Sequence, residues 1–228
     1  MLMQHTGRLD TGWDLKTTLS KRRSKQLSLP DLVESTNATA VYAPDVEIYG
    51  EGEPSEYFYR VVSGAVRTYK MLVDGRRQIC AFHLRGDLFG LESDDEHAFS
   101  AETIVNSKIR LIKRAVLMAQ AEYDNEVARR LWTMTGDELK RVQAHVLLLI
   151  KTAKERVAEF LLEMAERGSA DETVELPMSR QDIADYLGLT IETVSRTLTD
   201  LERNGTIFLP NSRRVVLRNR DALSQSCG

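Results

Sequence analysis

The chain has 228 residues, of which 42% are hydrophobic and 29% are charged, and its formal net charge at pH 7 is -3. This length allows one large or two modest domains with cores of their own, and the charge balance gives no overall basic signature of nucleic-acid binding. No apolar run is long enough to cross a bilayer, and the N-terminus lacks the apolar core of a secretory signal. We therefore expect a cytoplasmic protein without membrane contact.

The cysteines and histidines argue against a disulfide framework and a metal site. Cys80 and Cys227 are too few for a set of disulfides or for a four-cysteine iron–sulfur cluster. Cys80 lies in an apolar, strand-like run, and we expect it to be a small core residue. The four histidines show no spacing typical of metal ligands.

The first half of the chain predicts an arm followed by a β domain. Residues 1–38 are polar and include a basic run, so we interpret them as an N-terminal arm with some helix and little core. Residues 39–122 contain short strand-like runs. Turn signals separate these runs at Gly52, Gly64, Asp74-Gly75 and Gly86. Regular short spacing of this kind is typical of an antiparallel sandwich or jelly roll.

Residues 123–151 carry a long helical pattern. Apolar and small residues recur along it with the alternating spacing of three and four that marks a coiled-coil seam, and the pattern crosses Gly136. The members of this stripe are Trp132, Thr135, Leu139, Val142, Val146 and Leu149, with Ala153 continuing it. Such a stripe needs a partner, which is either its own domain or a second copy of the chain.

Residues 152–228 form the last predicted domain. It begins with an amphipathic helix at 155–167 that ends at Gly168. The inward residues of this helix are Val157, Phe160, Leu161 and Met164.

Two shorter helices follow and are hinged at Gly188. Ser179 can cap the first in a capping box with Asp182, and Thr190 can cap the second. Two apolar runs after Gly205 flank a Pro-Asn-Ser turn and predict a hairpin. This order of elements is that of a winged helix-turn-helix.

The second of these helices has one apolar and one polar face. Its apolar residues must point inward, which leaves a polar stripe where a recognition helix touches bases. The stripe contains Glu192, Ser195, Arg196 and Thr199. In the major groove an arginine reads guanine O6 and N7, while a carboxylate accepts from cytosine N4. The alternative is an exposed i,i+4 ion pair, but a carboxylate beside phosphates is costly unless it reads a base.

The segment that follows is locally basic. Its only ionisable side chains between residues 203 and 220 are Arg203, Arg213, Arg214, Arg218 and Arg220. Arg213 and Arg214 at the hairpin tip suit phosphate contacts, with a solvated loop as the alternative. Because a helix-turn-helix usually binds paired half-sites, we favour a homodimer seam for the long helix.

In this order of parts the chain resembles the CRP/FNR family of bacterial transcription regulators, over roughly residues 40–220. The most specific motif is SRQDIADYLGLTIETVSRTL; VSGAVRTYK, DGRRQI and RGDLFG are less specific. The resemblance implies an α+β protein with an N-terminal antiparallel β jelly roll like a cyclic-nucleotide-binding domain, a long dimerisation helix and a C-terminal winged helix-turn-helix.

The resemblance also implies roles for single residues. Glu192, Ser195 and Arg196 correspond to the base-reading residues of the family, and Ile191 stands where one branch has an arginine and suits a thymine methyl group. Arg180 corresponds to a phosphate contact. The complete set that we assign to phosphate contacts is Ser179, Arg180, Thr190, Thr193, Arg213 and Arg214.

The E-x-x-S-R pattern resembles the FNR and FixK branches, whose half-site is TTGA in an inverted repeat. The lack of cluster cysteines favours a FixK-like protein. This resemblance implies a sequence-specific homodimeric activator that binds double-stranded DNA, recruits RNA polymerase and controls genes of low-oxygen respiration and nitrogen fixation.

The pocket that holds a cyclic nucleotide in some family members looks degenerate. Leu91 stands in place of a glutamate and Phe99 in place of an arginine, and Asp94, Asp95 and Glu96 would repel a phosphate. We therefore expect no cyclic AMP and no cofactor.

Parts of the sequence suggest two other functions. The jelly roll could bind a different small-molecule effector, and this alternative stays open. A hydrolytic enzyme could use His97, Ser100 and Asp94, which lie close in sequence. Nothing around them resembles a nucleophile elbow, so we predict that the chain is not an enzyme.

Overall fold

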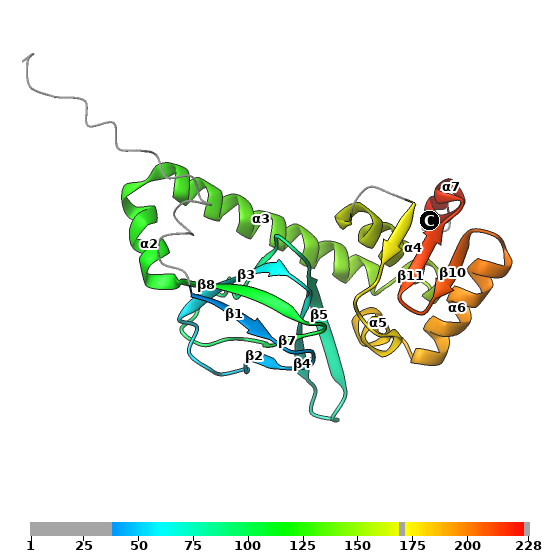
Figure 1. The fold of residues 1–228 in the computed structure, drawn as a ribbon, viewed down its shortest axis with the longest axis horizontal. Helices are drawn as coiled ribbons and strands as arrows, with labels where there is room; N and C mark the ends of the chain where they lie inside the picture. The colour runs from blue at the N-terminus through cyan, green and yellow to red at the C-terminus, as the bar shows by residue number, and fades with distance from the viewer. Residues whose placement is uncertain (1–37, 169–171, 226–228) are drawn as a thin grey trace, which may run out of the picture.

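The computed structural model describes residues 38–168 and 172–225. Figure 1 shows a β domain at one side, a helical domain at the other, and a long helix that joins them. The predicted N-terminal arm, apart from Ala38, and Cys227 lie outside the described residues. Within them, no helix combines the length and apolarity that a membrane span requires.

The N-terminal domain consists of two four-stranded antiparallel sheets, as the jelly-roll prediction requires. One sheet has the strand order β1-β8-β3-β6 and the other has the order β2-β7-β4-β5. The strands are β1 (Ala38–Tyr42), β2 (Glu47–Tyr49), β3 (Tyr57–Ser63), β4 (Val66–Met71), β5 (Arg77–His83), β6 (Leu88–Phe89), β7 (Ser100–Thr103) and β8 (Ser107–Lys113). Both sheets contribute to a buried core of Tyr49, Tyr59, Val61, Val66, Phe89, Ala101 and Ile109.

The turn signals of this domain occur where the sequence predicts them. Gly64, between β3 and β4, has a φ of 91°. A Cβ at this position would lie 2.2 Å from Ser107 Oγ and 2.7 Å from the Asn106 carbonyl oxygen, so only glycine fits there. The close approach of the two backbones fixes the path of the chain from one sheet to the other.

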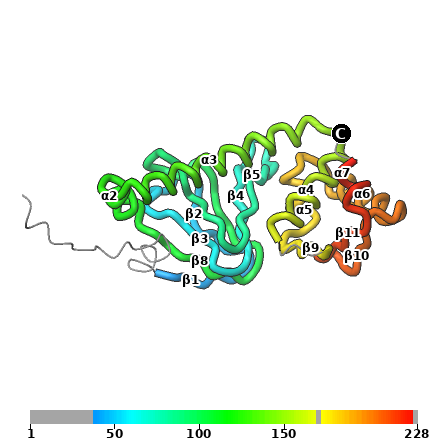
Figure 2. The backbone as a smooth tube through the Cα atoms, turned by 90° about the horizontal axis from the view of Figure 1, so that it is seen from above, coloured from blue at the N-terminus to red at the C-terminus, as the bar shows by residue number. Residues whose placement is uncertain are grey.

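Two helices link the domains. Helix α2 (Arg114–Tyr123) is followed by α3 (Asn125–Leu148), whose first N–H groups donate to the side chain of Asp124. Leu117 of α2 and Val127 of α3 pack against Phe58, Leu88 and Ile112 of the first sheet. Seen from above, α3 runs along the β domain toward the C-terminal domain (Figure 2).

The end of α3 corrects one detail of the predicted seam. The helix ends at Leu148, and a new helix, α4 (Ala153–Arg167), begins after the capping residue Thr152. Ala153 therefore does not continue the stripe, because the chain turns and Thr152 with Glu155 starts a separate helix through a capping box.

The C-terminal domain has the predicted helix-turn-helix and wing, with one additional strand. Its elements after α4 are β9 (Thr173–Glu175), α5 (Arg180–Leu187), α6 (Ile191–Arg203), β10 (Ile207–Asn211), β11 (Arg214–Leu217) and α7 (Arg220–Gln225). The wing is a three-stranded sheet in the order β10-β11-β9, where the sequence predicted only a hairpin. Strand β9 has three residues, too few for the alternating pattern that identifies a strand.

The position of Cys80 contradicts the sequence-based expectation. Its side chain is only partly buried, at a strand position between the buried residues Ile79 and Phe82. Burial still raises the pKa of the Cys80 thiol above its ordinary value, which disfavours the reactive thiolate.

Candidate nucleic-acid interface

The local structure of the helix-turn-helix follows from its caps and its glycine. Ser179 Oγ accepts from the Asp182 N–H at 3.1 Å, and Asp182 Oδ2 accepts from the Ser179 N–H at 3.0 Å, which forms the predicted capping box. Gly188 ends α5 in the left-handed conformation at a φ of 61°. Thr190 Oγ1 accepts from the Thr193 N–H at 3.2 Å and starts α6. Sequence reasoning located each of these features.

Helix α6 has the two faces that its sequence predicts. Val194, Leu198 and Leu201 are buried in the core of the C-terminal domain. The predicted base-reading residues lie on the opposite, exposed face; they are Ile191, Glu192, Ser195 and Arg196. The structure thus brings all four together on one side of the same helix.

The charges on this face are not paired with each other. Among the ion pairs of the described residues there is none between Glu192 and Arg196, although Arg196 is close enough to act on the carboxylate. The pKa of Glu192 is lowered, first by hydrogen bonds from its own backbone N–H and from Thr190, and then by the charge of Arg196. Both side chains are thus exposed and form no ion pair with each other within the described residues.

The predicted phosphate contacts divide into two groups. Ser179, Arg180, Thr190 and Thr193 lie at the N-termini of α5 and α6, where backbone N–H groups and the helix dipole favour anions. The Arg180 side chain is partly buried, its Nη1 atom is buried without a hydrogen-bond partner, and burial lowers the pKa of its guanidinium.

The second group is the wing, whose arginines contact the chain itself. Arg214 Nε donates to Glu175 Oε1 at 2.6 Å, and Arg213 Nη1 donates to the Pro177 carbonyl at 2.9 Å. Both side chains remain exposed, but the ion pair partly neutralises Arg214. Sequence reasoning did not foresee either partner, because Glu175 lies in the unpredicted strand β9 and Pro177 lies just after it.

The stripe along α3 is exposed in the single chain. Trp132 is 80% exposed and Val146 is 59% exposed, and Thr135, Leu139 and Val142 are exposed as well. The alternative that these residues pack against their own domain is therefore wrong. Leu149 differs, because it follows the last residue of α3 and its Cδ2 atom would lie 3.6 Å from a Cβ at Gly188.

The segment that corresponds to the cyclic-nucleotide pocket makes contacts within its own domain. Ser100 Oγ accepts from the Glu51 N–H at 3.0 Å, and Lys70 Nζ lies 5.8 Å from the centre of the Phe99 ring. Leu91 is partly buried, while the acidic residues Asp94, Asp95 and Glu96 are exposed.

The three residues considered for hydrolysis do not form a triad. His97 is buried, its ring stacks on Tyr49 with a centroid distance of 3.6 Å, and its Nδ1 atom lies 3.4 Å from Glu92. Ser100 accepts its hydrogen bond from Glu51, and Asp94 is exposed. Within the described residues, no group of three or more His, Cys, Asp or Glu side chains is arranged to hold a metal ion.

Comparison with known proteins agrees with this architecture. Residues 39–124 match the model of the cyclic nucleotide-binding domain, and residues 155–226 match the Crp-like helix-turn-helix domain. The nitrogen fixation regulation protein FixK of Azorhizobium caulinodans is 52% identical over 198 residues, which cover 84% of this chain and 80% of that protein. The chain belongs to the FixK branch of the CRP/FNR family of transcription regulators.

Other CRP/FNR relatives support this assignment. The FixK protein of Rhizobium meliloti is 39% identical over 87% of this chain and 91% of its own length. The structure of FixK2 from Bradyrhizobium japonicum matches with a TM-score of 0.82 and 53% identity, over 84% of this chain and 98% of that one. The family assignment confirms the predicted fold and the prediction that the chain is a regulator and not an enzyme.

The structure of this CRP/FNR regulator also reveals contacts between its domains that sequence reasoning missed. Arg67 of β4 and Arg77 of β5 form ion pairs with Asp182 of α5. Gln78 of β5 donates to the carbonyl of Asp185 near the end of the same helix. The one available signal was the charged Arg67 inside a strand whose neighbours are buried, but its partner is 115 residues away in sequence.

Proposed function

We propose that this regulator binds an inverted repeat of TTGA half-sites in double-stranded DNA as a homodimer. The observation that carries the proposal is the exposed face of α6, on which Glu192, Ser195 and Arg196 lie together without an ion pair between the two charges. Arg196 would read guanine and Glu192 would accept from cytosine of one G·C pair, while Ile191 suits a thymine methyl group.

The rest of the proposed interface holds the backbone of the duplex. Arg180 lies at the N-terminus of α5 with a side chain that is only partly buried, and its guanidinium would donate to a phosphate oxygen. Ser179, Thr190 and Thr193 offer hydroxyl and backbone groups at the two helix N-termini. Arg213 and Arg214 on the wing extend the contact along the strand.

The homodimer is proposed along α3. Its exposed stripe contains Trp132, Thr135, Leu139, Val142 and Val146, with Leu149 at the end, and exposed apolar residues at coiled-coil spacing need a partner helix. Two copies related by a two-fold axis would place one α6 in each of two successive major grooves. The half-sites would then be about one helical turn, or roughly 34 Å, apart.

We further propose that the protein works without cyclic AMP, as an activator that recruits RNA polymerase. The residues at the position of the nucleotide pocket support the first part, because Phe99 and Leu91 cannot hold a phosphate and a ribose as arginine and glutamate do. The relatives named as nitrogen fixation regulation proteins support a role in nitrogen-fixation and low-oxygen genes.

The experiment that tests this function is selection of bound sites from a pool of random DNA, without effector and at one stated salt concentration. The expected result is enrichment of TTGA inverted repeats, and light scattering should show a dimer. Equal retention of scrambled and intact palindromes would contradict the proposal. DNA affinity that appears only after a nucleotide is added would favour the effector-binding alternative.

A further inference from the structure

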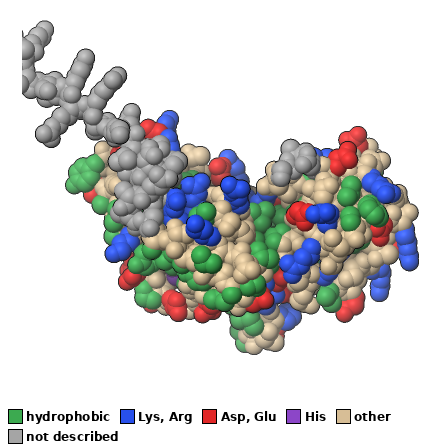
Figure 3. All heavy atoms as spheres, viewed as in Figure 1, with side chains coloured by type: hydrophobic (Ala, Val, Ile, Leu, Met, Phe, Trp, Pro, Cys, Tyr) green, Lys and Arg blue, Asp and Glu red, His purple; other side chains and the backbone are tan. Residues whose placement is uncertain are grey.

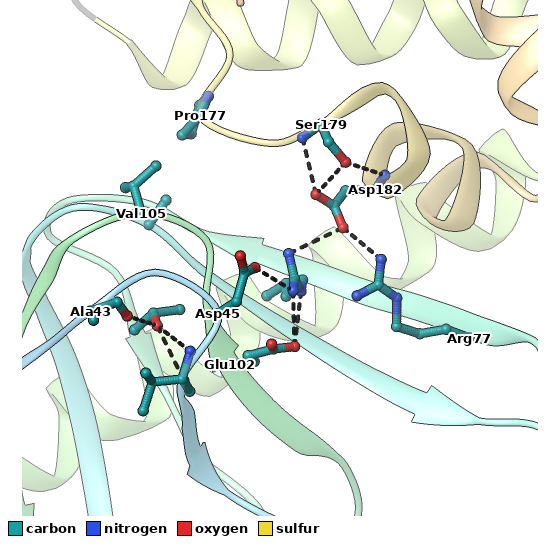
Figure 4. A network of polar contacts seen from close by, with 12 residues as sticks. Ala43, Asp45, Arg77, Glu102, Val105, Pro177, Ser179 and Asp182 are labelled. Atoms are coloured by element: carbon teal, nitrogen blue, oxygen red, sulfur yellow. Dashed lines mark hydrogen bonds and ion pairs between the residues drawn. The ribbon is translucent and has the colours of Figure 1, made fainter.

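The carboxylate of Asp182 has two sets of partners in two domains. Its Oδ2 atom accepts from the backbone N–H and the hydroxyl of Ser179, at 3.0 and 2.7 Å, within the cap of α5. Its Oδ1 atom accepts from Arg77 Nη2 at 2.7 Å and from Arg67 Nη1 at 3.2 Å. Figure 4 shows Asp182 between Ser179 on one side and the arginine side chains of the sheet on the other. The group that starts the first DNA-binding helix is therefore also its anchor on the β domain.

The two arginines are themselves held in place. The Arg67 side chain is only 7% exposed and also pairs with Glu102 and Asp45, each at 2.9 Å. Arg77 also pairs with Asp185, at 2.8 Å. We call the set of Arg67, Arg77, Asp182 and Asp185 the interdomain bridge. Because the Asp182 side chain is only 4% exposed, loss of both arginines would leave a buried carboxylate without an ion-pair partner.

Other contacts hold the far end of α5 and the helix before it. Gln78 Nε2 donates to the Asp185 carbonyl at 2.8 Å, near the C-terminal end of α5. Arg167 at the end of α4 pairs with Asp87 of the β domain at 2.6 Å. Helix α5 is thus attached to strands β4 and β5 along its length, while α4 has a separate contact of its own.

Helix α6 follows α5 directly and shares its core. Ile183 and Leu187 of α5 are buried in the same cluster as Val194 and Leu198 of α6. Any contact that fixes α5 on the β domain therefore also fixes the direction of the base-reading face. All four residues of the bridge belong to the same chain, so a single protomer supplies every side chain that holds this arrangement.

We propose that Arg67 and Arg77 are positioning residues for DNA recognition. They hold the helix-turn-helix at one orientation relative to the β domain and α3, and so set the separation of the two recognition helices in the dimer without an effector. This inference rests on the proposed function, since it assumes that the dimer reads paired half-sites.

The test compares the double variant Arg67→Gln/Arg77→Gln with wild type on palindromes whose half-site spacing is varied by single base pairs. Wild type should show a sharp optimum. The double variant should lose at least about fivefold in affinity at that optimum, and much less at the neighbouring spacings, because its recognition helices are no longer fixed. The single variant Arg77→Gln, which changes the less buried arginine, should show a smaller flattening.

Arg76→Gln provides the matched control, because Arg76 neighbours Arg77 but is exposed and pairs with Asp74 at 2.8 Å in its own turn. It should keep the wild-type spacing profile. An equal loss of affinity at every spacing in the double variant would mean that the bridge only stabilises the fold, and would overturn the proposal. So would a profile identical to that of wild type.

Hydrogen exchange of the DNA-free dimer separates this proposal from the proposed function. The amides of α5 should exchange faster in the double variant, while those of β3 and β8 stay protected. Unchanged protection of α5 would overturn the positioning role whatever the DNA result. If wild type shows no preference for a palindrome at any spacing, the proposed function fails, and the positioning role for DNA recognition fails with it.

Discussion

The two helices of the helix-turn-helix differ in what their carboxylates contact. In α5, Asp182 is buried and accepts from Ser179, Arg67 and Arg77. In α6, Glu192 is exposed and forms no ion pair within the described residues. Figure 3 shows acidic and basic side chains on the exposed surface of both domains. The difference separates a helix that is positioned by the chain from a helix whose polar groups are left for a partner.

The largest expected effect on stability comes from breaking the ion pairs of Asp182 in α5. Asp182→Asn should lower the free energy of unfolding by about 3 to 5 kcal/mol, because it leaves two arginines facing a neutral group in a buried site. Chemical denaturation measures this change. Asp200→Asn is the control on α6, where the exposed Asp200 lies 3.7 Å from Arg203, and should cost less than about 1 kcal/mol. Equal losses in the two variants would contradict the comparison.

Removing a charged side chain from the exposed face of α6 should weaken DNA binding and leave the stability of the fold almost unchanged. Arg196→Ala should weaken binding by about 1 to 3 kcal/mol per half-site and relax discrimination at the guanine. Titration of the dimer with the palindrome and with single-base variants checks this. Arg203→Ala, an exposed residue at the other end of α6, is the control. A uniform loss on specific and random DNA would show that Arg196 does not read a base.

The stability of the β domain should depend on pH through His83 of β5. Burial lowers the pKa of His83 to about 3, so the folded chain keeps this imidazole neutral, and its Nε2 atom contacts Thr68 Oγ1 at 3.2 Å. Below its ordinary pKa of 6.5 the unfolded chain binds a proton that the folded chain does not. His83 should therefore make stability fall by up to about 1.4 kcal/mol per pH unit as pH drops from there toward 3.

Unfolding by urea at several pH values measures this slope. The variant His83→Gln should lose that part of the pH dependence, whatever its stability at neutral pH. If the slope of the variant equals that of wild type, His83 is not its source.

The smallest expected effect concerns the wing. Arg213→Ala should weaken binding to all sequences alike and reduce the slope of log affinity against log salt concentration by about one unit. The Arg213 contact with the Pro177 carbonyl leaves the rest of the guanidinium available for a phosphate. A change in sequence preference in this variant would place Arg213 at a base edge instead.

What the sequence predicted well is local. The caps at Ser179 and Thr190 start the two helices through hydrogen bonds that span three residues, and Gly188 ends the first helix in the left-handed conformation. The period of α6 separates its two faces. Such signals depend only on neighbours along the chain, so they are visible without a structure.

What it did not predict depends on distant parts of the chain. The partners of Asp182 lie 105 and 115 residues away, and a carboxylate that caps a helix gives no sign of a second role. Strand β9 forms because it pairs with β11. The partial exposure of Cys80 depends on how other elements pack against β5, which its apolar neighbours in sequence do not show. In each case the deciding atoms belong to another element.

The interdomain bridge also limits how freely this C-terminal domain can be transplanted. A chimaera that joined residues 152–228 to the β domain of another regulator would carry the whole base-reading face of α6 with it. It would leave behind Arg67, Arg77 and Gln78, which belong to β4 and β5. Sequence preference should therefore transfer with the domain, whereas tolerance of half-site spacing should depend on whether the new host supplies equivalent cations.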